Sequence, residues 1–139
     1  MADDTPSDTP AEIERLIARA EAALAGLRVL VVEDEFLIAL DLGSILDALG
    51  CVVLGPAATV AEALRLLAAD PPDAALLDLN LNGTRTTPVA LALAAGGVPF
   101  ATVSAYTSRP EPVFDGVPAV AKPFAPERVR DALLGLARP

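Results

Sequence analysis

Apolar residues recur along the chain in two patterns, one typical of buried strands and the other typical of helices. Uninterrupted runs rich in valine, leucine and alanine predict strands that are covered on both faces. Such runs lie at residues 27–32, 51–57, 71–79, 98–104 and 117–121. Because none of them alternates cleanly between apolar and polar residues, we expect a parallel sheet that is buried on both sides.

Segments with apolar residues at helical spacing lie before, between and after these runs. They predict helices at residues 9–26, 35–50, 59–69, 87–97 and 126–137. Thr9 and Thr59 are each followed by a glutamate at the third position beyond them, which is the pattern of a capping box. Thr87 and Pro88 likewise predict the cap and the first residue of the helix that follows the third strand.

Strands that alternate with helices predict an α/β fold, with a doubly wound parallel sheet and helices on both faces. Residues 106–118 are the exception, because Pro110 and Pro112 stand where a helix should connect the last two strands. We therefore expect this fourth helix to be short or absent. We divide the chain into residues 1–26, a disordered tail followed by an extra amphipathic helix, and residues 27–139, the α/β domain.

The N-terminal helix carries one apolar stripe, whose members are spaced so that they share a face. The stripe consists of Ile13, Leu16, Ile17, Ala20 and Leu24. Two interpretations are open at this stage. The stripe packs against the domain, or it forms the contact between two copies of the chain in a homodimer.

Composition narrows the class of partner. The 139 residues are enough for one domain, and the net charge of −9 argues against a direct contact with nucleic acid. The single Cys51 excludes an internal disulfide. The acidic N-terminus does not resemble a signal peptide, and no apolar stretch approaches the roughly 18 residues needed to span a membrane. We therefore expect a cytoplasmic protein without a membrane contact.

Chemically active side chains stand where the predicted strands end. Glu33 and Asp34 follow the first strand, Asp78 ends the third, Ser104 ends the fourth, and Lys122 follows the fifth. Because parallel strands bring their carboxyl ends to the same edge of a sheet, we expect these groups to converge there.

Acids packed this closely repel one another, so that at least one must bind a proton or share a cation. An all-oxygen site suits Mg²⁺, with Mn²⁺ as an alternative. Asp34 and Asp78 would bind the ion directly, Glu33 would bind it through water, and the backbone carbonyl of Asn80 would add a ligand. Asn82 and Gly83 beyond them read as a turn.

A metal that leaves one oxygen of Asp78 free allows this carboxylate to attack phosphorus. Lys122 and the Ser104 hydroxyl would then stabilise the charge on the transferred phosphoryl group, together with the metal.

Four segments, "VLVVEDE", "LLDLNLNG", "TVSAY" and "AKPF", resemble in this order the receiver domain of two-component response regulators. The resemblance covers residues 27–137. It implies a flavodoxin-like fold with strand order 2-1-3-4-5 and phosphorylation of Asp78 by a histidine kinase or a histidine phosphotransfer protein. It also implies that Glu33 and Asp34 are the acidic pair of the family, Ser104 its switch hydroxyl and Lys122 its invariant lysine. A cis bond before Pro123 is implied as well.

The chain departs from the family at the aromatic switch. Receivers usually carry an aromatic residue three positions before the lysine, and this chain has Ala119 there. Tyr106 is the nearest aromatic residue and a candidate for the switch. The stretch "PFATVSAY" partly resembles the signature of the FAT GUY group of stand-alone receivers, which implies a weakened fourth helix.

We therefore expect a single-domain response regulator that catalyses only its own phosphorylation and dephosphorylation. It would switch a surface for an unknown downstream protein, or act within a phosphorelay. One rival is a Mg²⁺-dependent phosphatase or mutase of the haloacid dehalogenase type, although that family needs an acid where Asn80 stands. A second rival is a receiver that acts as a docking module without phosphorylation.

Overall fold

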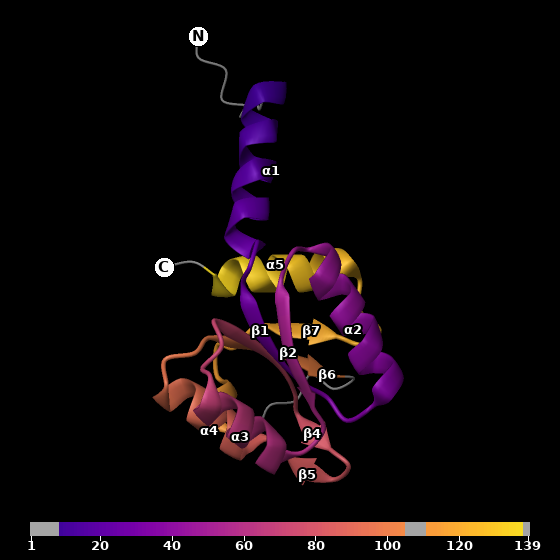
Figure 1. Cartoon of the computed structure of the whole chain (residues 1–139), viewed down its shortest axis with the longest axis vertical. Coiled ribbons are helices and arrows are strands. Elements are labelled where there is room, and N and C mark those ends of the chain that lie inside the picture. Colours follow the sequence, from indigo (N-terminus) through magenta and orange to yellow (C-terminus); the bar gives the residue numbers. More distant parts are fainter. Residues whose placement is uncertain (1–8, 105–110, 138–139) are drawn as a thin grey trace.

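The computed structural model describes residues 9–104 and 111–137 and contains a parallel sheet with helices on both faces (Figure 1). The sheet has five strands in the order β2-β1-β3-β6-β7. Its strands are β1 (Arg28–Val32), β2 (Val52–Ala57), β3 (Ala74–Asp78), β6 (Phe100–Ser104) and β7 (Ala119–Ala121). Because β4 and β5 form a separate hairpin, this order is the 2-1-3-4-5 arrangement of a flavodoxin-like fold, as the sequence predicts.

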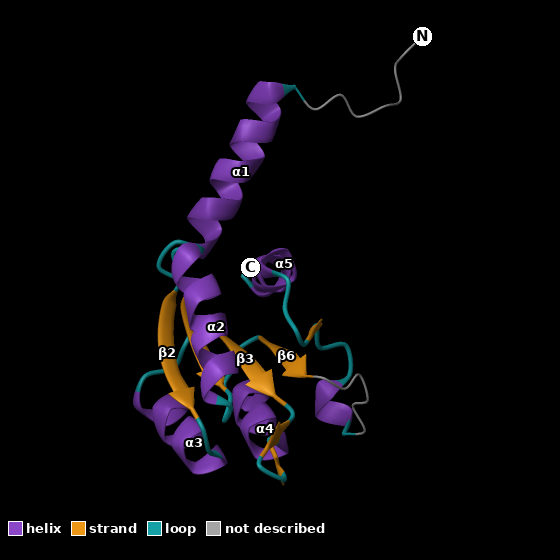
Figure 2. Ribbon diagram, turned by 90° about the vertical axis from the view of Figure 1, so that its right-hand side faces the viewer, coloured by secondary structure: helices purple, strands orange, loops and turns teal. Residues whose placement is uncertain are grey.

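The helices cover the two faces of the sheet in pairs. One pair is α2 (Phe36–Ala48) and α5 (Pro126–Leu136), and the other is α3 (Val60–Ala69) and α4 (Thr87–Ala95). Figure 2 shows α5 on one side of the strands and α3 and α4 on the other. Each pair closes its own apolar cluster against the strands.

Strand β1 illustrates how the sequence divides between the two clusters. Val29 and Val31 pack toward α2 and α5, whereas Leu30 and Val32 pack toward α3 and α4. All four side chains are buried. Since successive side chains point to opposite faces, a continuous apolar run is what a central strand of a doubly covered sheet requires.

Two of the predicted helix caps are confirmed and one is wrong. Thr9 and Thr59 accept hydrogen bonds from the amides three residues ahead of them, as expected. Helix α4, in contrast, begins at Thr87 and has Thr86 as its cap residue. The hydroxyl of Thr86 makes no cap hydrogen bond, because it donates to the carbonyl of Asp78 at 2.6 Å instead.

Between β6 and β7, residues 111–118 contain one short 3-10 helix, η1 (Pro112–Phe114). The expectation that no full helix occupies this connection is confirmed for these residues. Phe114 is buried and packs edge-on against Phe100, with the ring centroids 6.3 Å apart. Tyr106 lies outside the described residues.

Helix α1 (Pro10–Leu24) extends away from the domain (Figures 1 and 2). Only Leu24, in its last turn, is buried, while Ile13, Leu16 and Ile17 are about half exposed. These three side chains are therefore not buried by their own domain, although Leu16 and Ile17 line a groove between α1 and α5. The described part of the chain contains no helix with the length and apolar character needed to cross a membrane.

A small hairpin follows β3 and was not predicted from the sequence. It consists of β4 (Asn80–Leu81) and β5 (Thr84–Arg85), which pair in antiparallel fashion. Asn82 and Gly83 form its two-residue turn, both with positive φ (50° and 87°), which is the preferred geometry for an Asn-Gly hairpin. The turn itself was expected, but strands of two residues are too short to give a periodic signal.

Candidate phosphoacceptor and metal site

The carboxyl ends of the parallel strands point to one edge of the sheet, as the arrowheads of β2, β3 and β6 show in Figure 2. Glu33 and Asp34 follow β1, Asp78 ends β3, and Lys122 follows β7. The structure brings these four side chains together from distant parts of the chain. The sequence-based expectation that they converge is confirmed.

Lys122 lies between two acids. Its Nζ is 2.7 Å from Oε1 of Glu33 and 2.9 Å from Oδ2 of Asp78. All three side chains are largely removed from solvent, with 12% of the Lys122 side chain exposed. In such surroundings water screens the ion pairs weakly, so they hold the ammonium group firmly at the edge of the sheet.

The backbone around Lys122 and Asp78 is also fixed. The amide of Lys122 donates to the carbonyl of Ser104 at 3.1 Å, and the peptide bond between Lys122 and Pro123 is cis, as the family resemblance implied. Oδ1 of Asp78 accepts a hydrogen bond from the amide of Asn80 at 3.2 Å. Ser104 is buried at the end of β6. Asp78, Ser104 and Lys122 therefore lie at the ends of three adjacent strands, β3, β6 and β7.

The acids form a candidate metal centre. Glu33, Asp34 and Asp78 each offer one carboxylate oxygen, and these oxygens lie within 4.8 Å of one another. Glu33 and Asp78 are buried, whereas Asp34 is partly exposed. Three carboxylates with one side open to solvent suit a hard divalent cation that keeps some of its waters, such as Mg²⁺.

Burial changes the acid–base behaviour of this site. Removal of Glu33 from water raises its pKa from 4.5 to about 7, although hydrogen bonds from Lys122 and from the Glu35 amide oppose the change. For Lys122, burial acts to lower the pKa, but the hydrogen bonds to Glu33 and Asp78 outweigh it, so that the pKa is raised. The lysine thus keeps its charge, and Glu33 is the acid that takes up a proton near neutral pH.

Two further predicted site residues remain untested by the geometry. Asn80 is exposed, and its side-chain Oδ1 accepts a hydrogen bond from the Gly83 amide at 2.6 Å, so the side chain is held in the hairpin turn. The role of its carbonyl as a metal ligand stays a prediction. The switch role of Tyr106 falls outside the described residues.

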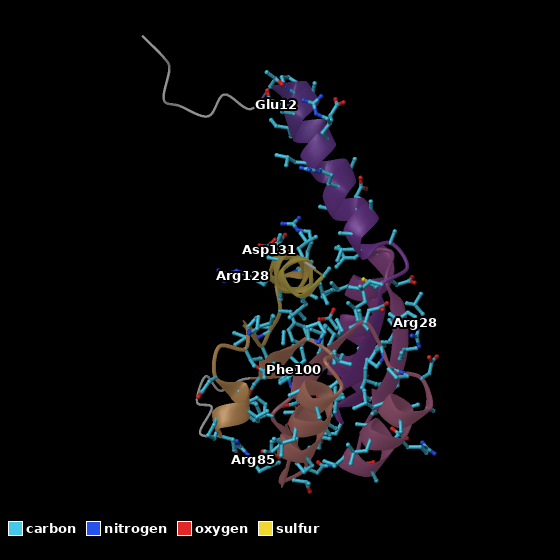
Figure 3. All side chains as sticks on the ribbon, turned by 90° about the vertical axis from the view of Figure 1, so that its left-hand side faces the viewer. Glu12, Arg28, Arg85, Phe100, Arg128 and Asp131 are labelled. Atoms are coloured by element: carbon cyan, nitrogen blue, oxygen red, sulfur yellow. The ribbon has the colours of Figure 1, made fainter. Side chains whose placement is uncertain are left out.

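Three residues next to the site were missed by the sequence analysis. Thr86 contacts the Asp78 carbonyl, and Arg85 forms a double hydrogen bond with Glu111, at 3.1 Å and 2.6 Å. Figure 3 shows Arg85 at the hairpin end of the domain, far from Glu12 on α1. No local pattern marks these residues, because their partners lie 8 and 26 positions away along the chain.

The fold and the site together define a flavodoxin-like α/β domain with acids and a lysine at the carboxyl edge of its sheet. No family model matches the chain. Known proteins nevertheless show similarity. SdrG from Sphingomonas melonis Fr1 is 37% identical with a TM-score of 0.72, over 83% of this chain and 98% of SdrG. The receiver (REC) domain of the response regulator PhyR from Erythrobacter litoralis is 30% identical with a TM-score of 0.70, over 82% of this chain and 92% of that domain. The chain therefore belongs to the receiver domains of response regulators.

Longer relatives contain more than this domain. PhyR, the phyllosphere-induced regulator of Methylorubrum extorquens, is 34% identical over 120 residues, which are 80% of this chain and 43% of PhyR. The response regulator PhyR from Brucella abortus is 33% identical with a TM-score of 0.69, over 91% of this chain and 55% of that protein. The chain thus spans about half the length of the PhyR proteins it matches.

Proposed function

We propose that Asp78 accepts a phosphoryl group, with Mg²⁺ bound, from the phosphohistidine of a histidine kinase or a histidine phosphotransfer protein. The close approach of Asp78 to two further acids and to Lys122 carries this proposal. The modified domain would then present a changed surface to a downstream protein or pass the phosphoryl group on in a phosphorelay. Apart from its own phosphorylation and dephosphorylation, it would catalyse nothing.

In the proposed reaction a carboxylate oxygen of Asp78 attacks phosphorus. The P–N bond breaks as the P–O bond forms, and the imidazole leaves after taking a proton from solvent. Mg²⁺ in the acidic cluster would neutralise charge on the phosphoryl oxygens. Lys122, whose Nζ is 2.9 Å from Asp78 Oδ2, would pair with one of those oxygens, and the Ser104 hydroxyl would donate to another.

A labelling experiment tests this function. The protein is incubated with acetyl phosphate and Mg²⁺. The mass of the intact chain and the position of the modified residue are then measured. We expect one phosphoryl group per chain, absent in Asp78→Asn and retained in Asp115→Asn, a matched change at an exposed aspartate away from the site. A wild-type chain that takes up no phosphoryl group from acetyl phosphate and binds no beryllofluoride would instead support the receiver that acts as a docking module without phosphorylation.

The surface beside the site supports a helical protein as phosphoryl donor. Phe36, Leu37 and Leu40, in the first turns of α2, are 75%, 74% and 55% exposed. Phe36 lies two residues after Asp34 in sequence, and Phe36 and Leu40 border a shallow groove of about 370 Å³ between α2 and β2. Exposed apolar clusters of this kind mark protein contacts. We propose that the donor's histidine-bearing helix lies against them.

Separating donor docking from chemistry tests this surface. Phe36→Ala combined with Leu40→Ala should slow transfer from a phosphorylated phosphotransfer protein about tenfold, since loss of buried apolar anchors costs roughly 1–2 kcal/mol. Labelling by acetyl phosphate should not change, because that small donor needs no docking. Leu91→Ala, at a side chain that is 55% exposed on α4, is the control. Equal transfer rates in all these proteins would contradict the proposed contact.

A protein as downstream partner is supported by one of the relatives. PhyR from Bartonella quintana, which is 28% identical with a TM-score of 0.69, is named an anti-anti-sigma factor. That name describes an action on another protein. The net charge of −9 in the present chain agrees with a protein rather than a nucleic acid as the immediate target.

A further inference from the structure

The backbone just after the phosphoacceptor is fixed by one buried threonine. The hydroxyl of Thr86 donates to the carbonyl oxygen of Asp78 at 2.6 Å, and its amide donates to the carbonyl oxygen of Leu79 at 3.2 Å. Asp78, Leu79 and Thr86 are all buried, and Thr86 is fully inaccessible to solvent. Thr86 thus provides hydrogen-bond donors for two backbone carbonyl oxygens at the end of β3, those of Asp78 and Leu79.

Thr86 is itself held in place from both sides. It follows the β4–β5 hairpin, and its own carbonyl accepts hydrogen bonds from the amides of Val89 and Ala90 in the first turn of α4. The acceptor backbone is therefore connected through one side chain to a helix terminus. A threonine chosen only to cap α4 would turn its hydroxyl toward that helix, and the hydroxyl of Thr86 makes no such bond.

The segment that Thr86 fixes is the segment expected to hold the cation. Asp78 contributes a carboxylate to the acidic cluster, and the Asn80 amide is hydrogen-bonded to that same carboxylate. The direction of the Asp78 side chain and of the peptide units up to Asn80 depends on how the backbone leaves β3. Partners that orient metal ligands in this way affect metal affinity strongly.

We propose that Thr86 is a positioning residue for metal binding and phosphoryl acceptance. Its hydroxyl holds the Asp78 carbonyl so that the carboxylate of Asp78 and the backbone up to Asn80 face Glu33 and Asp34. This inference rests on the proposed function, since it assigns to Thr86 a task within that same site.

The alternative is a purely structural role, in which the hydrogen bond stabilises the fold without influencing the site. Three substitutions of Thr86 distinguish the positioning role from the purely structural role. Thr86→Ser keeps the hydroxyl, Thr86→Val keeps the shape without a donor, and Thr86→Cys keeps the approximate size with a weak donor. Thr102→Val is the matched control, because Thr102 is also buried and its hydroxyl donates to a backbone carbonyl, that of Pro118, at 3.5 Å.

The measurement is a Mg²⁺ titration of the isotope-labelled full chain, followed by backbone amide shifts at a temperature where each variant is folded. We expect Thr86→Val to bind Mg²⁺ about tenfold more weakly or worse, the size of effect that partners of metal ligands show. Thr86→Ser and Thr102→Val should stay close to the wild type. The initial rate of labelling by acetyl phosphate at limiting Mg²⁺ should follow the same order.

Each outcome has a definite meaning. If Thr86→Val lowers the unfolding temperature but binds Mg²⁺ like the wild type, the positioning role is overturned. The positioning role is also overturned if Thr86→Ser and Thr86→Val weaken Mg²⁺ binding equally, because the loss of the hydroxyl would then not be the cause. If the Thr86→Val variant does not fold, Thr86→Cys takes its place. We then expect a severalfold loss of Mg²⁺ affinity, and an unchanged affinity would overturn the inference. A wild-type chain that binds no Mg²⁺ would overturn the proposed function itself, and this inference with it.

Discussion

At the scale of single residues, Glu33 has the most unusual surroundings in the site. It is 1% exposed, lies 2.7 Å from Lys122, and has a pKa raised to about 7, mainly because burial penalises its charged form. A bound divalent cation would favour the charged form of the same carboxyl group. A proton and a metal ion would therefore compete for Glu33 near neutral pH.

The first prediction follows from this competition. Mg²⁺ affinity should fall as the pH is lowered from about 8 to 6, through the raised pKa of about 7. In Glu33→Gln the affinity should be weaker throughout and much less sensitive to pH in this range. Calorimetric Mg²⁺ titrations at several pH values measure both effects. An identical pH dependence in the two proteins would show that another group titrates.

The same pKa predicts how stability depends on pH in the absence of metal. Because the pKa of Glu33 is raised from 4.5 to about 7, the folded state binds a proton that the unfolded state has already released. The contribution of Glu33 to stability is thus present below about pH 4.5 and is lost as the pH rises through about 7. Urea unfolding of wild type and Glu33→Gln should show a difference that changes across this window, and a constant difference would contradict it.

A third residue-scale prediction concerns Gly55 in β2, whose φ is +93°. A Cβ atom there would lie 2.8 Å from the Ala57 nitrogen and 2.9 Å from the Val31 carbonyl oxygen, both backbone atoms. Gly55→Ala should therefore lower the free energy of unfolding by more than about 2 kcal/mol. Gly43→Ala, in α2 with free space around the added atom, should be neutral or stabilising by about 0.5–1 kcal/mol. Urea denaturation compares the two, and similar losses would refute the argument.

At the scale of elements, the β4–β5 hairpin connects strand β3, which ends on Asp78, to the segment beyond residue 110. Arg85 at the end of β5 pairs with Glu111, which precedes η1, through two hydrogen bonds. Glu111 belongs to the connection between β6, which ends on Ser104, and β7, which precedes Lys122. The hairpin thus links β3 to the connection between β6 and β7.

The pair can be tested by exchanging its charges. Arg85→Glu and Glu111→Arg should each lower the thermal midpoint, because each places two like charges together, and the double variant should recover most of the loss. The hydrogen bond from Arg85 lowers the pKa of Glu111, so the stabilisation is present above the usual pKa of this acid and is lost as the pH falls through the lowered value. Equal losses in the single and double variants would show that the pair contributes nothing.

At the scale of the whole molecule, α1 stands apart from the domain with Ile13, Leu16 and Ile17 about half exposed (Figure 3 labels Glu12 at its far end). Its last turn meets α5, where a groove of about 770 Å³ is lined by Leu24, Leu134 and their neighbours. An isolated helix of this length is marginal in water, so the exposed stripe favours a partner. The homodimer contact remains our prediction for that partner.

Light scattering tests the dimer directly. We expect the mass of two chains for the wild type and of one chain for Leu16→Ser combined with Ile17→Ser, which leaves the buried Leu24 in place. Added salt should strengthen the dimer, because two copies with a net charge of −9 each repel one another. Leu91→Ser on α4 is the control. A single-chain mass for the wild type at all salt concentrations would remove the dimer.

Local patterns determined most of the architecture. The apolar runs located all five strands of the main sheet, and caps such as Thr59 located helix starts, because burial on two faces and unpaired helix amides each impose a short-range rule on sequence. The rule that parallel strands share a carboxyl edge also predicts that Asp34, Asp78 and Lys122 lie close together. These parts of the fold and the site could therefore be predicted from the sequence.

Only the tertiary structure decided which side chains complete the site and which surfaces stay uncovered. No sequence pattern marks Thr86, whose partner Asp78 lies eight positions away, and the burial that raises the pKa of Glu33 exists only in the folded chain. The half-exposed stripe of α1 has the same spacing that a packed stripe would have. Periodicity states that a face is apolar, but which atoms meet it depends on long-range packing that no local rule encodes.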